Sequence, residues 1–130
     1  MSIPDHLRAS IEDLPLFEAQ AFSVLRELEE EGDEELFIGI ARQFLADVED
    51  LLARLDPAIR ECDRKSIASI AHTLKGSAAT FGLIQMQEIA LQLELSANAP
   101  DAGDSVCWFE WLKRSFLAGR LGLEAELNKV

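Results

Sequence analysis

Apolar residues spaced every three or four positions are the feature that most limits what this chain can fold into. The spacing recurs along successive segments, as on one face of an α-helix, and no segment shows the strict alternation of a half-buried β-strand. Glycine and proline fall at the joints between segments. The pattern predicts an all-α fold, an antiparallel four-helix bundle with short extra helices at the termini.

The N-terminal part divides from the rest at a proline. Residues 1–14 mix polar and apolar positions, and we expect a leader or a short docked helix there, with residues 15–130 forming the bundle domain. Pro15 suits the first turn of a helix that runs to about Leu28, because an N–H at that position would lack a helical partner anyway. The length of 130 residues is typical of one domain.

Capping residues and helix breakers place the later helices. Asp33 is expected to cap a long helix in which Pro57 causes a kink or a break. Asp63 is expected to cap the next helix and Gly82 to end it. Residues 98–104 form the clearest loop. Apolar residues at helical spacing mark the long helix after Asp33: Phe37, Ile40, Ala41, Phe44, Val48, Leu51, Leu52, Leu55 and Ile59.

A last helix is expected from about Ser105. Gly119 and Gly122 weaken its continuation, because glycine costs about 1 kcal/mol of helix stability relative to alanine. Residues 121–129 would then hold a short terminal helix. Four apolar residues are expected to share one stripe of the last helix: Val106, Phe109, Leu112 and Phe116.

Composition and charge exclude several classes of partner. Hydrophobic residues make up 48% of the chain, as in a globular rather than a disordered protein. The formal net charge of −12 argues against nucleic acid or an anionic membrane and favours partners with positive patches. No apolar run approaches the roughly 20 residues that span a bilayer. Cys62 and Cys107 match neither a metal-binding spacing nor a disulfide framework, and without an apolar signal segment a cytoplasmic location is expected.

The helix expected over residues 64–80 separates two kinds of residue. At about 100° per residue, His72, Lys75 and Gly76 fall on one face. The opposite face, expected to turn to the core, is apolar: Ile67, Ile70, Ala71, Leu74, Ala78 and Phe81. The sequence therefore predicts an exposed histidine with a cation one turn away.

These three residues suit a nucleophile that works beside an anion. Histidine side chains ionise at about pH 6.5, so a neutral imidazole nitrogen is available as a nucleophile at physiological pH. Lys75 can reach the same point in space and compensate a bound anion. Gly76 weakens the helix and is better explained by the access that it gives to the imidazole. The alternative is a surface histidine with a chance neighbouring lysine.

Residues 71–83 resemble the signature of the histidine-containing phosphotransfer (HPt) domain family. The match consists of the run Ala71-His72-Thr73-Leu74-Lys75-Gly76-Ser77 and of Gly82, ten residues after the histidine. The preceding helix is also similar to the family pattern, and the resemblance covers about residues 25–97.

The resemblance implies a fold, a function and partners. HPt domains are four-helix bundles with the histidine exposed in mid-helix. By similarity, His72 would accept a phosphoryl group from a phospho-aspartate on one receiver domain and pass it to the aspartate of another. This implies a phosphocarrier of a multistep phosphorelay rather than an enzyme, since the receiver would supply the magnesium and most catalytic groups. The implied partners are receiver domains of a hybrid sensor histidine kinase or a response regulator, and a monomer is the family's common state.

The resemblance also implies roles for neighbouring residues. Lys75 would compensate phosphoryl charge and Gly76 would give steric access. Glu94 occupies the position where family members have a glutamine or glutamate that holds Nδ1 of the histidine; the alternative is an ordinary surface acid. Receiver docking uses an apolar patch around the histidine, and four residues are candidates: Ala68, Ser69, Thr73 and Ala79. Periodicity leaves four more undecided: Phe37, Ile38, Ile84 and Gln87.

Two other classes of protein remain as alternatives. A helical adaptor would bind a receiver or kinase domain without being phosphorylated, as family members that have lost the histidine do. A carboxylate-bridged di-metal bundle would need Glu-x-x-His pairs, which the chain lacks. With only two histidines, the sequence predicts no metal and no cofactor.

Overall fold

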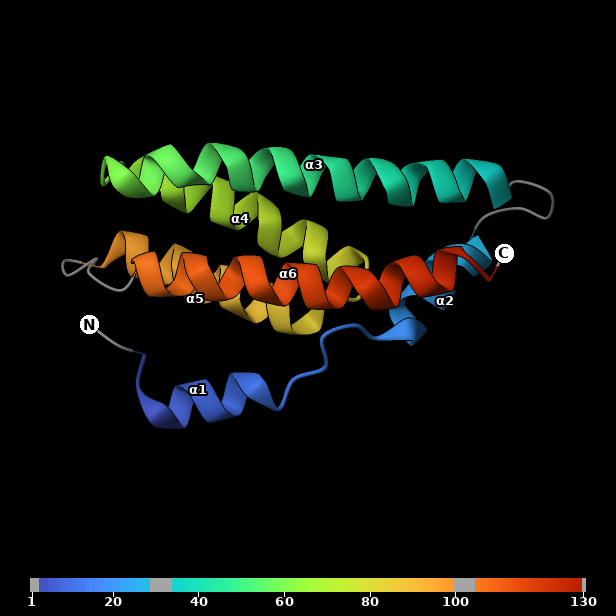
Figure 1. The fold of residues 1–130 in the computed structure, drawn as a ribbon, viewed down its shortest axis with the longest axis horizontal. Helices are drawn as coiled ribbons and strands as arrows, with labels where there is room; N and C mark the ends of the chain where they lie inside the picture. The colour runs from blue at the N-terminus through green and yellow to red at the C-terminus, as the bar shows by residue number, and fades with distance from the viewer. Residues whose placement is uncertain (1–2, 29–33, 100–104, 130) are drawn as a thin grey trace.

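The computed structural model describes residues 3–28, 34–99 and 105–129, and helices account for most of them (Figure 1). The expected cap at Asp33 and most of the expected loop, residues 100–104, lie outside these described ranges. The helices follow in this order: α1 Asp5–Glu12, α2 Ala19–Leu28, α3 Glu34–Arg60, α4 Arg64–Thr80, α5 Ile84–Asn98 and α6 Ser105–Leu127.

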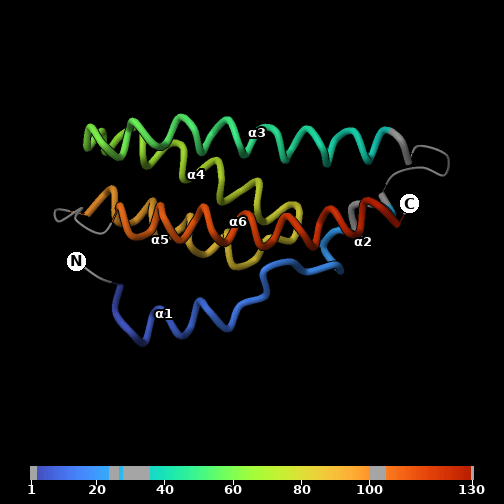
Figure 2. The backbone as a smooth tube through the Cα atoms, in the orientation of Figure 1, coloured from blue at the N-terminus to red at the C-terminus, as the bar shows by residue number. Residues whose placement is uncertain are grey.

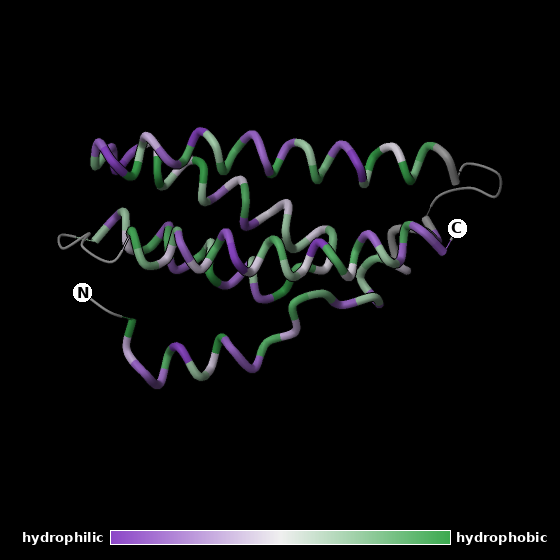
Figure 3. Tube along the Cα trace, viewed as in Figure 1, coloured by the Kyte–Doolittle hydropathy of each residue, from purple (hydrophilic) through white to green (hydrophobic). Residues whose placement is uncertain are grey.

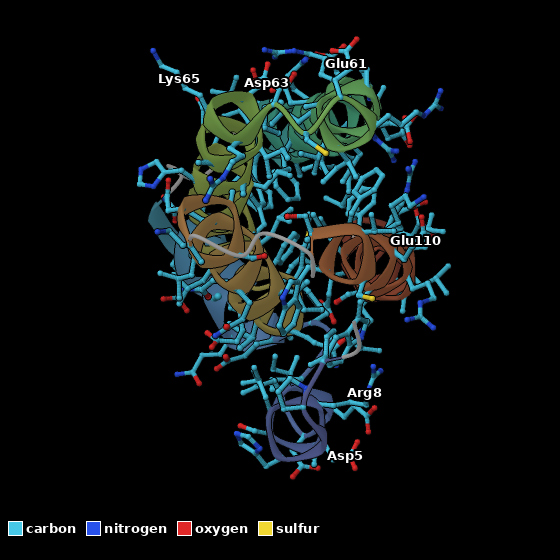
Figure 4. The ribbon with its side chains drawn as sticks, turned by 90° about the vertical axis from the view of Figure 1, so that its left-hand side faces the viewer. Asp5, Arg8, Glu61, Asp63, Lys65 and Glu110 are labelled. Carbon is cyan, nitrogen blue, oxygen red and sulfur yellow. The ribbon has the colours of Figure 1, made fainter. Side chains whose placement is uncertain are left out.

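The four long helices, α3 to α6, form the bundle. α4 packs against α3 and α5, and α6 packs against the same two helices. The four therefore occupy the corners of a square in end view (Figure 4), and each runs antiparallel to the next (Figure 2). Hydrophobic and hydrophilic positions succeed one another along each long helix, as amphipathic packing requires (Figure 3). The predicted fold class is confirmed. The largest fully buried side chains of these helices fill the interior: Val48, Leu55, Leu74, Met86, Ile89, Leu93, Leu112, Phe116 and Leu123.

Tight turns at both ends of α4 fix its place in the bundle. At its start, the Asp63 side chain accepts a hydrogen bond from the Ser66 N–H at 3.3 Å, as the sequence predicted for an N-cap. At its end, Gly82 has a φ of +78°, and the Leu83 N–H donates to the Ala78 carbonyl at 2.9 Å. This is the glycine-terminated helix end that the sequence predicted.

Two predicted breaks in the helices are absent. α3 runs unbroken through Pro57, so of the two alternatives, a kink or a break, the break does not occur; the proline removes one helical hydrogen bond, and only three residues of α3 follow it. α6 continues to Leu127, so the separate helix expected over residues 121–129 does not form. A Cβ at Gly119 would lie 2.7 Å from the Leu16 carbonyl oxygen, and one at Gly122 would lie 2.9 Å from the ring of Phe17. These glycines make room for a crossing segment rather than ending the helix.

That crossing segment, residues 15–18, also corrects the predicted start of the second helix. α2 begins at Ala19, not at Pro15. The Glu18 N–H donates to the Gly82 carbonyl at 2.7 Å, and the Gln85 N–H donates to the Pro15 carbonyl at 2.9 Å. Contacts with the turn between α4 and α5 therefore hold these residues outside the helix.

The segment before Pro15 contains a short helix docked on the bundle. Ile11 of α1 is buried, and the Gln85 side-chain amide donates to its carbonyl at 3.3 Å. Arg8 of α1 lies over the ring of Trp111, 5.4 Å from its centroid. In Figure 4, α1 lies below α5 and α6, away from α3 and α4.

Two residues placed on core stripes by their spacing are exposed instead. Ile40 of α3 is 45% exposed and Val106 of α6 is 55% exposed. Helical spacing locates the centre of a buried stripe better than its edges, and both residues lie at an edge. On α6, Trp108 and Trp111 occupy buried positions beside the expected stripe.

Candidate functional site

His72 lies in the middle of α4 and points away from the core. The apolar stripe on the opposite face is buried, as predicted: Ile67, Ile70, Ala71, Leu74, Ala78 and Phe81. Since that stripe fixes the rotation of the helix, the His72 side chain is left 67% exposed. The histidine is therefore presented to solvent by the packing of its own helix.

Glu94 of α5 connects His72 and Lys75. One carboxylate oxygen, Oε2, lies 3.0 Å from Nδ1 of His72, and the other, Oε1, accepts a hydrogen bond from Nζ of Lys75 at 2.8 Å. Glu94 is only 19% exposed, because it lies where α4 packs against α5. The sequence placed Lys75 beside His72 but gave no sign that it pairs with Glu94.

The charge on Glu94 determines which nitrogen of His72 carries the proton. The hydrogen bond from Lys75, with a smaller contribution from His72, holds the pKa of Glu94 below its ordinary value despite partial burial. Glu94 is thus a carboxylate at neutral pH and can only accept hydrogen bonds. Nδ1 of a neutral His72 must then carry the hydrogen and donate it to Glu94, which leaves the lone pair on Nε2.

The remaining predicted site residues lie along α4 within about two turns of His72. A Cβ added to Gly76 would meet no heavy atom within 4 Å, so the space beside the imidazole is open. Ser69 and Thr73 are exposed, and Ala68 and Ala79 are half-buried. Of the residues left undecided by periodicity, Phe37 is buried, and Ile38, Ile84 and Gln87 are half-buried.

A shallow groove between α3 and α4 was missed by the sequence analysis. Its volume is about 270 Å³, and its lining is mixed: Ile40, Gln43, Phe44, Asp47, Ser77 and Phe81. Ile40 and the nearby Leu36 of α3 are 45% and 55% exposed, so apolar surface continues outside the groove. The sequence feature that could have indicated this surface is Leu36, an apolar residue that lies outside the main apolar stripe of α3.

The described residues offer neither a metal site nor a membrane-spanning helix. Residues 3–28, 34–99 and 105–129 contain no group of three or more histidine, cysteine or acidic side chains arranged to hold a metal ion. None of the helices within those ranges is long and apolar enough to cross a membrane.

Comparison with known proteins identifies the family. The model of the Hpt domain matches residues 39–129, which include α4, α5, α6 and most of α3. The chain belongs to the Hpt domain family. The Hpt match leaves α1 and α2 outside its bounds, so the family pattern coincides with the bundle and not with the N-terminal helices.

Two individual proteins are similar to this Hpt domain. Over 94 residues, 72% of this chain, it is 30% identical to Multistep phosphorelay regulator 1 of Schizosaccharomyces pombe (strain 972 / ATCC 24843), and it spans 31% of that protein's length. The crystal structure of histidine-containing phosphotransfer protein B (HptB) from Pseudomonas aeruginosa PAO1 superimposes with a TM-score of 0.81. That likeness covers 89% of this chain and 97% of HptB at 22% identity, and it supports the fold.

Proposed function

We propose that this chain is a histidine phosphotransfer protein of a multistep phosphorelay. His72 accepts a phosphoryl group from the aspartate of one receiver domain and passes it to the aspartate of a second receiver domain. The chain acts as a phosphocarrier, and the receiver supplies the magnesium ion and most of the catalytic groups. The partners are receiver domains of a hybrid sensor histidine kinase, a response regulator, or both.

The observation that carries this proposal is the contact between Nδ1 of His72 and the Glu94 carboxylate at 3.0 Å. It directs the lone pair of a highly exposed imidazole to Nε2, away from α5. In the forward step, this lone pair forms a bond to phosphorus while the bond from phosphorus to the aspartate oxygen breaks. The electron pair of that bond leaves with the aspartate carboxylate. No proton needs to move, because Nδ1 keeps its hydrogen throughout.

Glu94 and Lys75 compensate the charges that appear during transfer. The imidazole ring gains positive charge once Nε2 is bonded to phosphorus, and the adjacent Glu94 carboxylate stabilises that charge. Lys75 has three donor hydrogens and uses one of them toward Glu94, so two remain for phosphoryl oxygens. Phosphoryl transfer depends mainly on this kind of positioning and electrostatic compensation.

The surface around His72 is suited to receiver docking. Gly76 leaves open space beside the imidazole, so a partner's aspartate can approach in line. On the α3 side, Leu36 and Ile40 expose apolar surface beside the groove. Exposed apolar surface of this kind is typical of a protein interaction site. Four residues complete the proposed docking face: Ala68, Ser69, Thr73 and Ala79.

A labelling experiment tests the proposal. The protein is incubated with a phosphorylated receiver domain, and acid-labile, base-stable label is followed on the wild type, on His72→Gln and on His6→Gln. His6 is the other histidine of the chain and is exposed on α1, which makes it a matched control. Label on the wild type and on His6→Gln but not on His72→Gln is expected. Equal label on all three would refute the role of His72, and receiver binding without label on any of them would favour an adaptor.

A further inference from the structure

Positive charge is concentrated on α4, the helix that contributes most of the proposed docking face. α4 contains Arg64, Lys65 and Lys75 and no aspartate or glutamate, so it carries a formal charge of +3. Since the whole chain carries −12, the remaining residues together carry −15. The helix that presents His72 is therefore a positive strip on an acidic protein, and the overall charge does not describe its surface.

Most of the positive side chains of α4 are already occupied. Lys75 is bound to Glu94 at 2.8 Å. Arg64 donates to the carbonyl oxygens of Ala97, at 2.9 Å, and Ala99, where it caps the end of α5. Both cations are explained by contacts within the fold.

Lys65 of α4 and Arg54 of α3 are different. Both side chains are exposed, and neither forms a hydrogen bond or ion pair with any residue in the described ranges. The nearby acid Asp63 is engaged elsewhere, because its oxygens accept from the N–H and the hydroxyl of Ser66, the latter at 2.7 Å. That hydrogen bonding, more than the charge of Lys65, lowers the pKa of Asp63. Figure 4 shows Lys65 projecting outward from α4, apart from Glu61 at the end of α3.

The two cations line one groove on the seam between α3 and α4. Its volume is about 270 Å³, and its lining residues are Arg54, Lys65, Ser66, Ser69 and Ile70. Ser69 lies one helical turn before His72, and Lys65 lies two turns before it, about 10 Å along the helix axis. The mixed groove near Ile40 lies on the same seam, toward the C-terminal end of α4. The docking face thus has a positive end and an apolar end.

We propose that Arg54 and Lys65 form an electrostatic contact that binds carboxylate side chains of the receiver domain and sets its orientation over His72. The inference rests on the proposed function, and it specifies the partner surface as acidic where it faces α4 about two helical turns before His72. Two unpaired cations that line one groove attract an acidic patch to that groove, and the net charge of −12 disfavours its approach to the acidic parts of the surface. Contacts of this kind act mainly on the rate of association and on orientation, and they weaken as salt increases.

A charge-reversal experiment tests the contact. The double variant Arg54→Glu/Lys65→Glu is compared with Arg114→Glu/Lys129→Glu, which changes the net charge equally. Arg114 and Lys129 are exposed residues on α6 and just after it, and α6 is the helix diagonally opposite α4 (Figure 4). A panel of purified receiver domains is screened first, and the domain that labels the wild type fastest is the probe. Circular dichroism verifies that both variants fold.

At about 20 mM salt, the Arg54/Lys65 variant is expected to lower kcat/KM for transfer from the phosphorylated receiver by about tenfold or more. The difference should shrink at about 300 mM salt, where charges are screened over a few ångströms. Labelling of His72 by phosphoramidate, which needs no docking surface, should stay unchanged. An unaffected kcat/KM, or an equal loss in the Arg114/Lys129 variant, would overturn the proposal.

The outcome separates this inference from the proposed function. If neither phosphoramidate nor any receiver labels the wild type, the phosphocarrier function fails. The role of Arg54 and Lys65 is then tested by calorimetry, which measures receiver binding to the wild type and to both double variants at the same two salt concentrations. Binding that is weakened only in the Arg54/Lys65 variant supports the contact, and binding that is the same in all three proteins refutes it.

Discussion

Gly76 allows the requirements of the fold to be separated from those of the proposed phosphoryl transfer. The residue lies inside α4, and a Cβ placed on it would meet no heavy atom within 4 Å. Replacement by alanine therefore introduces no clash and removes the conformational freedom that makes glycine unfavourable in a helix. The expected effect is a stabilisation of about 1 kcal/mol.

The expected gain in stability corresponds to a measurable rise in melting temperature. Unfolding entropies are about 2.1 cal/mol/K per residue, which gives about 0.27 kcal/mol/K for this chain of 130 residues. A gain of about 1 kcal/mol should therefore raise the melting temperature of Gly76→Ala by about 4 °C. Gly39 of α3, which also has no heavy atom within 4 Å of an added Cβ, is the matched control and should show a similar gain on replacement by alanine.

The rate of phosphoryl transfer should fall as the side chain at position 76 becomes larger, even though alanine there stabilises the fold. Gly76 lies one turn from His72 on the open face, so a leucine or methionine there would occupy the approach to Nε2. The rate of label transfer from a phosphorylated receiver should fall from Gly76→Ala to Gly76→Leu while both variants remain folded. A destabilised Gly76→Ala would show that the glycine is needed by the fold, and a wild-type rate in Gly76→Leu would refute the role in access.

Three further predictions concern neighbouring residues. Lys75→Ala should slow transfer while costing less than about 1 kcal/mol of stability; a large fall in melting temperature would make Lys75 structural. Because the folded-state pKa of Glu94 is lowered, the stability advantage of the wild type over Glu94→Gln should be complete above about pH 5 and disappear as the pH falls through that lowered pKa. Urea denaturation at several pH values measures this, and an advantage that grows in acid would contradict it. Gly82→Ala should destabilise the fold by more than about 1 kcal/mol, since φ is +78° and a Cβ would lie 2.5 Å from the Glu18 carbonyl oxygen; unchanged urea denaturation would show that the turn relaxes.

Local signals in the sequence were sufficient for α4. Its buried stripe, the cap at Asp63 and the end at Gly82 all depend on residues within a few positions of one another. The outward direction of His72 follows from that stripe, so it could be predicted from periodicity alone. The functional roles of the surrounding residues stay predictions.

Contacts between distant segments explain the errors. Nothing near Pro15 shows that its carbonyl will accept from Gln85, and this contact is part of what keeps residues 15–18 out of α2. Gly119 resembles a helix breaker in its own sequence, although its role is to let Leu16 pass. The pairing of Lys75 with Glu94 depends on the register of α4 against α5, which periodicity within one helix does not determine.

The close packing of α4 on α5 has a consequence for the order in which this molecule comes apart. The two helices form a hairpin joined by a tight turn, and both ends of the His72–Glu94 contact lie within it. Residues 15–18 are mostly exposed and contact the bundle at Gly82, Gln85 and Gly119, and exposed segments with few buried contacts open at low free energy. In native-state hydrogen exchange, the Glu18 amide, which donates to the Gly82 carbonyl, should therefore exchange before the amides of α4 and α5. Thermal fluctuations that loosen the N-terminal helices would then leave the contact between His72 and Glu94 assembled.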